Sequence, residues 1–286
     1  MTTIATLLRA GPTRSLEFFP PRTDDAERRF RFALGELSVL EPSFASVTYG
    51  ALGSTQERTR EIVLHMNEEQ TFPTMAHLTC VGHTRAEVDE LLNQYAKAGV
   101  RNILALGGDP PADGSHPDGD FTHAIELVEV VRAHPADFCV GVAAHPELHP
   151  RSPDRASDRR HLAAKLRLAD FAITQFFFRV SDYERLVDEL AALGCDRPVL
   201  PGVMPFVSAD GLRRMAAMNR TTIPEGIATQ LDAIGGDPEA VEALGVEVAA
   251  RLCRDLMAAG APGLHLYTLN RASPVRRVWD QLADWG

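Results

Sequence analysis

The chain of 286 residues contains eight short apolar runs, and segments with the spacing of amphipathic helices lie between them. The runs are rich in β-branched and aromatic residues, as buried strands are. They are Ser15–Phe19, Phe44–Tyr49, Thr74–Cys80, Asn102–Leu106, Phe138–Ala144, Phe171–Phe178, Pro198–Met204 and Leu264–Leu269. Alternation at steps of roughly 30 residues is typical of a parallel α/β sheet, and eight units favour a closed (β/α)8 TIM barrel over an open sheet.

Helical spacing is found between these runs and in the long interval before the last one. The predicted helices are Asp24–Leu40, Gln56–Asn67, Thr84–Ala98, Asp120–Ala133, Ser157–Leu168, Ser181–Leu193, Ser208–Asn219, Pro224–Ile234 and Pro238–Ala259. Thr84 and Ser181 each begin a capping box, with a glutamate three residues later. We therefore expect extra helices between strands seven and eight, and a single (β/α)8 catalytic domain over residues 1–286.

Composition narrows the partners that a chain of this kind can have. The net charge of -10 argues against a broad nucleic-acid or anionic-membrane surface, and no apolar run reaches the roughly 18 residues of a membrane span. The four cysteines form no Cys-x-x-Cys pair, and the first ten residues do not resemble a secretory signal. We expect a cytoplasmic protein that binds a small molecule. Its oligomeric state is left open.

Polar residues follow the apolar runs at the points where the predicted strands end. In a parallel barrel these ends meet at one rim, where catalytic side chains gather. The run Asn102–Leu106, for example, ends in Gly107, Gly108 and Asp109. The whole rim set comprises Glu17, Thr48, Tyr49, His77, Thr79, Asp109, His145, Glu147, His149, Gln175, Met204, Tyr267, Asn270 and Arg271.

Glu17 is the most informative of these residues because it interrupts an otherwise apolar strand. Desolvation of an unpaired carboxylate raises its pKa toward values that suit a general acid. The alternative is a salt bridge to a neighbouring strand. We favour the catalytic interpretation.

The spacing His145-x-Glu147-x-His149 raises the question of a metal site. Pro146 and Pro150 interrupt the strand geometry that would place the three side chains on one face. We therefore predict no metal. A metal-dependent barrel hydrolase that uses His77, His145 and His149 is kept as an alternative.

Ordered motifs along nearly the whole chain resemble one family, the bacterial methylenetetrahydrofolate reductases. The motifs are Ser15-Leu-Glu-Phe-Phe-Pro-Pro, Ser46-Val-Thr-Tyr-Gly-Ala, His77-Leu-Thr, Gly108-Asp-Pro, His145-Pro-Glu-x-His-Pro, Ile173-Thr-Gln-Phe-Phe-Phe, Pro201-Gly and Tyr267-Thr-Leu-Asn-Arg. The resemblance implies a (β/α)8 barrel that reduces 5,10-methylenetetrahydrofolate to 5-methyltetrahydrofolate.

The resemblance also implies roles for residues on the substrate side. Glu17 matches the acid that assists ring opening by delivering a proton toward N10. Asp109 and Gln175 match groups that hold the pterin and serve catalysis, and Arg271 matches a residue of the folate site. Tyr267 and Phe206 complete the expected substrate site, with Phe206 replacing an aromatic residue that aligns with Ala209.

At the positions expected to contact the cofactor, this chain differs from the usual family pattern. The expected cofactor contacts are Thr48, Tyr49, His77, Gly107, Gly108, His145, His149, Asp158 and Lys165. Members that bind FAD usually carry Leu-Arg-Gly-Asp where this chain has Leu106-Gly107-Gly108-Asp109, a tyrosine at His145, and an arginine at Ala164. These departures argue against tight FAD binding and favour direct hydride transfer from NADH or NADPH. The alternatives are an FAD-dependent reductase of the same reaction and a folate-binding paralogue without catalysis.

Overall fold

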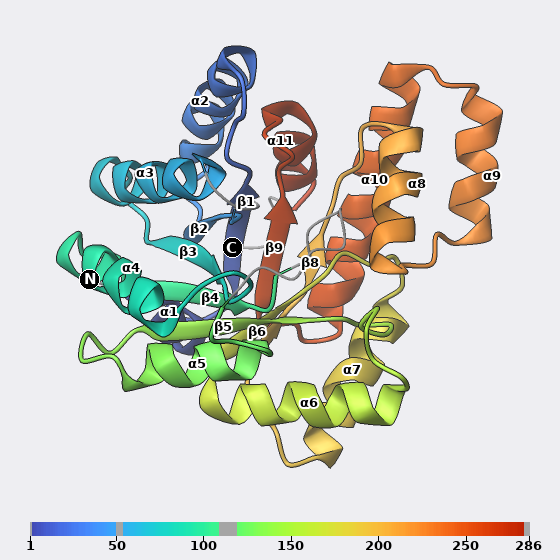
Figure 1. The fold of residues 1–286 in the computed structure, drawn as a ribbon. Coiled ribbons are helices and arrows are strands. Elements are labelled where there is room, and N and C mark those ends of the chain that lie inside the picture. The colour runs from blue at the N-terminus through green and yellow to red at the C-terminus, as the bar shows by residue number, and fades with distance from the viewer. Residues whose placement is uncertain (1, 50–53, 109–118, 283–286) are drawn as a thin grey trace.

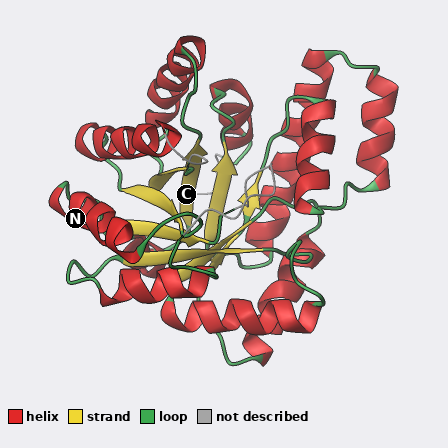
Figure 2. Ribbon diagram, viewed as in Figure 1, coloured by secondary structure: helices red, strands yellow, loops and turns green. Residues whose placement is uncertain are grey.

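The computed structural model describes residues 2–49, 54–108 and 119–282. Its strands pair in parallel in the order β7-β6-β5-β4-β3-β2-β1-β9-β8. Their bounds are β1 Thr13–Phe18, β2 Phe44–Val47, β3 Thr74–Thr79, β4 Asn102–Leu106, β5 Cys139–Ala144, β6 Phe171–Thr174, β7 Val199–Leu200, β8 Gly202–Val203 and β9 Gly263–Tyr267. The strands form the centre of the molecule and helices surround them (Figures 1 and 2).

The barrel closes through a strand that is interrupted at Pro201. β7 pairs with β6, whereas β8 pairs with β9, and only Pro201 separates the two pieces. Proline cannot donate a backbone hydrogen bond, but its carbonyl still accepts one from the His265 amide. Counted as one strand, β7 and β8 complete an eight-stranded parallel barrel, which confirms the predicted fold class.

Most of the helices lie around the outside of the sheet. The helix α1 and the insertion formed by α8, α9 and α10 are described separately below. Their bounds are α1 Ile4–Ala10, α2 Asp24–Ser38, α3 Ser54–Glu69, α4 Arg85–Lys97, α5 Ala124–Ala133, α6 Arg155–Leu168, α7 Val180–Ala192, α8 Ala209–Asn219, α9 Glu225–Ile234, α10 Pro238–Ala258 and α11 Ala272–Asp280. Every predicted helix is present with ends within a few residues. The helices α1 and α11 were not predicted, and the structure adds both.

Alternation along each strand divides the core into two parts. Leu16 and Phe18 of β1 belong to the large apolar cluster between the sheet and the outer helices. Ser15 and Glu17 alternate with these two residues along β1. Their side chains therefore point to the other face of the sheet. The interior of the barrel therefore receives polar groups from β1.

The amino-terminal end of the barrel is covered by α1. The Ile4 amide donates to Asn102 Oδ1 (2.9 Å), and Asn102 is the first residue of β4. Ile4 also joins a small apolar cluster with Phe44, Met75 and Leu104. The interior at this end is thus mostly apolar, and Glu17 and its histidine partners lie nearer the opposite end.

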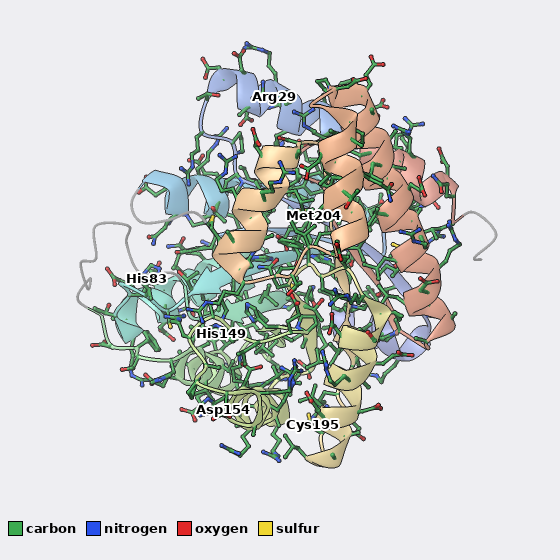
Figure 3. All side chains as sticks on the ribbon, turned by 90° about the vertical axis from the view of Figure 1, so that its right-hand side faces the viewer. Arg29, His83, His149, Asp154, Cys195 and Met204 are labelled. Atoms are coloured by element: carbon green, nitrogen blue, oxygen red, sulfur yellow. The ribbon has the colours of Figure 1, made fainter. Side chains whose placement is uncertain are left out.

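The helices α8, α9 and α10 form the predicted insertion between the seventh and last strands, at one side of the barrel (Figure 1). They enclose a second apolar cluster that includes Met204, labelled in Figure 3, together with Phe176 and Phe206. Phe206 is 1% exposed. Its ring therefore packs in this core, and its role in the substrate site stays a prediction.

One predicted helix start is confirmed and the other is wrong. Thr84 caps α4 in a complete capping box with Glu87. In contrast, α7 begins at Val180, after Arg179, so Ser181 lies inside the first turn and caps nothing. A capping residue needs an extended backbone, and that conformation occurs at Arg179. None of the helices within the described ranges is long and apolar enough to cross a membrane.

Candidate active site

Glu17 lies inside the barrel near the carboxyl ends of the strands and is 5% exposed. Three neighbouring strands meet at its Oε2 atom. His265 Nε2 of β9 lies 3.2 Å away, His77 Nε2 of β3 lies 3.4 Å away, and the Ser46 hydroxyl of β2 donates over 3.4 Å. The carboxylate therefore has hydrogen-bond partners in His265 and Ser46, whereas His77 Nε2 lies close to it without forming a hydrogen bond to any described residue.

This environment reverses the pKa shift that the sequence predicts for Glu17. Burial alone raises the pKa, but the charges of His77 and His265 and the hydrogen bond from His265 outweigh it and lower the pKa from 4.5 to about 2. The expected raised pKa is wrong because the partners come from strands that are remote in sequence. Contacts with histidines of other strands, as in the salt-bridge alternative, are therefore present, and the catalytic role of Glu17 stays a prediction.

The imidazole of His265 is fixed by a second partner. Its Nδ1 lies 2.8 Å from the Ser15 hydroxyl, and that hydroxyl donates to the Leu264 carbonyl (3.1 Å). With its proton directed to Leu264, Ser15 accepts from Nδ1–H. Nε2 of the same ring faces Glu17 Oε2 over 3.2 Å. The two groups are thus placed so that a proton can pass between them.

Tyr267 and Gln175 lie at the same end of the barrel, on β9 and after β6. The Tyr267 hydroxyl donates to the Thr174 carbonyl (2.6 Å), and burial followed by the charge of Glu17 raises its pKa well above 10. The Gln175 side chain accepts from the Phe176 amide (3.0 Å). Gly202 permits this packing, because a Cβ there would lie 2.7 Å from the Tyr267 ring.

Thr48 and Tyr49 follow β2 as predicted and are half-buried. The Tyr49 hydroxyl lies 2.9 Å from His83 Nε2, and burial raises its pKa. The Thr48 carbonyl accepts from the Thr59 hydroxyl (3.3 Å). Of the residues predicted to bind the cofactor, His77 is placed instead against Glu17. The roles of Thr48, Tyr49 and His77 as cofactor contacts stay predictions.

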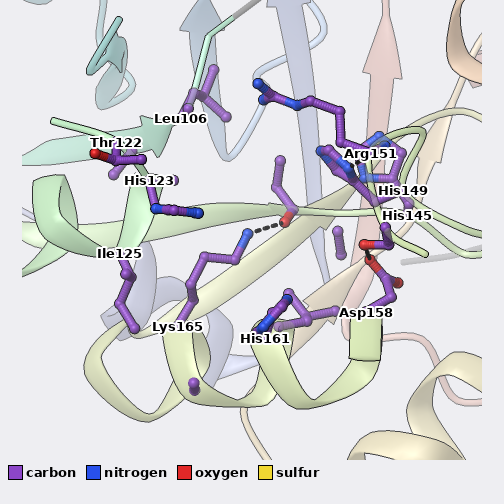
Figure 4. A pocket seen from close by; sticks show the side chains of 18 of the residues that line it. Leu106, Thr122, His123, Ile125, His145, His149, Arg151, Asp158, His161 and Lys165 are labelled. Atoms are coloured by element: carbon purple, nitrogen blue, oxygen red, sulfur yellow. Dashed lines mark hydrogen bonds between the residues drawn. The ribbon is translucent and has the colours of Figure 1, made fainter. Parts of the chain in front are cut away.

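A cavity of about 530 Å³ opens between the ends of β4 and β5 and the helices α5 and α6 (Figure 4). It brings together Gly107, His145, His149, Asp158 and Lys165, five of the predicted cofactor contacts. Three further basic side chains also line it: His123, Arg151 and His161. The described lining is rich in nitrogen bases and contains one acid, Asp158.

The acid and the lysine that line this cavity differ in how their charges are balanced. Asp158 accepts from the Ser152 hydroxyl (3.0 Å) and forms an ion pair with Arg159, so its charge is offset. Lys165 donates to the Ala143 carbonyl (3.3 Å, dashed in Figure 4), and burial lowers its pKa. The cationic lining fits an anionic group such as the diphosphate of a dinucleotide.

The histidines of the candidate metal motif contact one another instead of converging with Glu147. The rings of His145 and His149 are 4.6 Å apart in an edge-to-face arrangement, and burial lowers the pKa of His145 to about 3. Glu147 accepts from the Thr222 amide with both oxygens (2.9 and 3.2 Å). No group of three possible metal ligands occurs within the described residues.

Some of the predicted site residues lie apart from this cavity, and one lies outside the described residues. Arg271 lines a separate cavity of about 400 Å³ beside α2, together with Asn270 and Arg29, the latter labelled in Figure 3. Gly108, with φ of 82°, ends the described part of this turn. Asp109 lies outside the described residues, and its role stays a prediction.

The family model for methylenetetrahydrofolate reductase matches residues 3–283. The chain belongs to this family. A 5,10-methylenetetrahydrofolate reductase of Pectobacterium carotovorum is 37% identical over 259 residues, which cover 90% of this chain and 86% of the relative. A relative from Arabidopsis thaliana, named methylenetetrahydrofolate reductase (NADH) 1, is 35% identical over 90% of this chain and 46% of its own length.

A solved structure supports the barrel fold of this methylenetetrahydrofolate reductase family member. It is an uncharacterised protein from Clostridium thermocellum, which binds two copies of 5-methyl-5,6,7,8-tetrahydrofolic acid. The TM-score is 0.64 at 13% identity, over 97% of this chain and 96% of that chain. At this identity the likeness establishes the fold alone.

His265, Ser15 and Arg151 are the site residues that sequence reasoning missed. His265 interrupts an apolar strand, as Glu17 does, so the same signal was available for it. Ser15 lies two residues before Glu17 and therefore shares its face. Arg151 stands in an irregular loop after His149, where no spacing rule connects it with Gly107.

Proposed function

We propose that this chain reduces 5,10-methylenetetrahydrofolate to 5-methyltetrahydrofolate with hydride taken directly from NADH or NADPH. The observation that carries the proposal is the 3.2 Å contact between Glu17 Oε2 and His265 Nε2 at the carboxyl end of the barrel. Family membership and the cationic cavity support it. The name of the Arabidopsis relative supports a nicotinamide as the hydride source.

In this proposal, the pair Glu17–His265 supplies the proton of the reaction. Protonation at N10 opens the five-membered ring of the folate and leaves an iminium carbon. Hydride from the reduced nicotinamide adds to that carbon, which yields the methyl group and the oxidised nicotinamide. One proton and one hydride are consumed, so atoms and electrons balance. The charge of Glu17 also favours the developing cation.

Gln175 and Asp109 are proposed to hold the pterin. An amide offers both a donor and an acceptor, which matches a pterin edge with N–H groups and a carbonyl. Gln175 stands at the end of β6, beside the Tyr267–Thr174 hydrogen bond. Tyr267 and Arg271 are proposed to contact the remainder of the folate.

Direct transfer without tightly bound FAD is the finer part of the proposal. It is supported by Gly107, His145 and Ala164, which line the cavity where FAD-binding members carry an arginine, a tyrosine and an arginine. The cavity's cations suit the diphosphate that nicotinamide dinucleotides and FAD share. Ala164 brings no guanidinium to it, which weakens the case for the larger flavin dinucleotide.

The deciding experiment is an absorbance spectrum of freshly purified protein, followed by NADH and NADPH oxidation assays with and without added FAD. We expect no flavin band and folate-dependent oxidation that added FAD leaves unchanged. A stoichiometric flavin band with ping-pong kinetics would contradict direct transfer and select the FAD-dependent alternative. Folate binding without oxidation of either nucleotide would select the non-catalytic paralogue.

A further inference from the structure

Arg151 occupies the space beside Gly107. A Cβ atom added at Gly107 would lie 3.3 Å from Arg151 Nη2, and this same nitrogen donates to the Gly108 carbonyl (3.2 Å). The guanidinium therefore packs closely against Gly107, at a distance that a Cβ atom would crowd slightly. It reaches this place from the loop between β5 and α6, next to His149 in Figure 4.

The guanidinium of Arg151 is also available to a ligand. No carboxylate of the described residues forms an ion pair with Arg151, whereas Arg159 on the adjacent helix is paired with both Asp158 and Glu189. Arg151 is exposed, and its side chain lines the 530 Å³ cavity. Its bond to the Gly108 carbonyl uses one donor and leaves the others of the planar fork for an anion.

The surrounding side chains point to the same class of ligand. Lys165, His123 and His161 line the cavity with Arg151, and the one described acid is offset by Arg159. For a chain with a net charge of -10, this is a local reversal of sign. Such a lining favours phosphate oxygens over the neutral parts of a nucleotide.

We propose that Arg151 is the diphosphate-binding arginine of this chain, supplied from the β5–α6 loop in place of one on the β4 turn, where Gly107 brings no side chain. This assignment rests on the proposed function for the identity of the ligand, a nicotinamide dinucleotide. It makes Arg151 a determinant of dinucleotide affinity that takes no part in the chemical step.

The test is titration calorimetry with ADP-ribose, which carries the diphosphate and cannot donate hydride. Arg151→Ala is expected to bind ADP-ribose about ten- to a hundredfold more weakly, the effect of losing a charged hydrogen-bond donor. Arg160→Ala is the matched control, because Arg160 is an exposed arginine of α6 outside the cavity lining. It is expected to bind ADP-ribose within twofold of the wild type.

Two further measurements keep the test decisive. Arg151→Lys retains the charge but loses the planar fork, and we expect binding to weaken by about five- to tenfold, which settles the matter if Arg151→Ala fails to fold. Adenosine, which lacks phosphate, should bind the wild type and Arg151→Ala alike. Equal ADP-ribose affinity in wild type and both Arg151 variants, or an equal loss for adenosine, would overturn the assignment.

The outcome is separable from that of the proposed function. Wild-type protein that binds ADP-ribose through Arg151 but oxidises neither nucleotide in the presence of methylenetetrahydrofolate would contradict the reductase proposal alone. An active reductase whose Arg151→Ala variant binds ADP-ribose as tightly as the wild type would contradict the Arg151 assignment alone.

Discussion

The barrel mouth has two regions that handle charge in opposite ways. On the side of β1, β3 and β9, the Glu17 carboxylate is almost fully buried and faces two histidines and a serine. On the side of β4, β5 and α6, the Arg151 guanidinium is exposed beside a cavity. One region has its charges matched internally, and the other presents unmatched cations.

The difference corresponds to two different tasks. A proton must be released at one place and in one direction, and fixed partners in a water-poor interior provide this. A ligand that brings its own negative charge must bind and leave, and an open cationic lining provides that without a buried unpaired charge. Mutations on the two sides should therefore separate turnover from affinity.

The largest effect is expected for Glu17→Gln. The amide cannot exchange a proton with His265 Nε2, so turnover should fall by on the order of a hundredfold or more while folate binding changes little. Steady-state oxidation of NADH and a folate titration measure the two quantities. Glu61→Gln, an exposed carboxylate of α3, is the control. Unchanged turnover in Glu17→Gln would remove this residue from the chemical step.

Ser15→Ala probes the positioning of His265 at a smaller scale. Without the hydroxyl 2.8 Å from Nδ1, the imidazole loses the partner that fixes its tautomer. Turnover should fall by about tenfold, a usual effect of removing a group that orients a functional histidine. The pH profile of kcat should shift as well. A profile that superimposes on that of the wild type would show that Ser15 only fills space.

On the cavity side, Lys165→Met should change affinity instead of turnover. The half-buried ammonium lines the dinucleotide cavity, and its loss should raise KM for NADH by about tenfold with kcat nearly constant. Lys97→Met, at the exposed end of α4, controls for the change in net charge. A fall in kcat with unchanged KM would erase the distinction between the two regions.

The smallest effect is expected for the titration of His145. Its pKa is lowered to about 3 by burial and by the neighbouring His149, so the ring is neutral above that pH and charges only below it. Between pH 5.5 and 8, KM for NADH in His145→Gln should follow the same pH dependence as the wild type, within about twofold. If KM for NADH depends on pH in the wild type but not in His145→Gln, the prediction that His145 stays neutral in this range is wrong.

Most of the fold follows from local pattern, whereas the electrostatics of the site depend on distant pairings. The strand Asn102–Leu106 and the Thr84 cap were predictable because periodicity and capping are properties of neighbouring residues. The predicted Ser181 cap is wrong because the extended residue that precedes the helix is Arg179, two positions earlier.

The pKa of Glu17 could not be predicted in the same way. It is set by His77 and His265, which approach only after the barrel closes. Arg151 was equally hidden, since its position beside Gly107 depends on two loops folding together.

The helix α1 has a kinetic consequence for any reaction in this barrel. Because Ile4 and the apolar side chains packed on it fill the amino-terminal end of the barrel, ligands reach the site from the carboxyl-terminal mouth. Substrate and product then share one route and exclude each other along it. The order in which two reactants arrive and two products depart becomes part of the catalytic rate, and slow departure of a product would limit the enzyme even where the chemical step is fast.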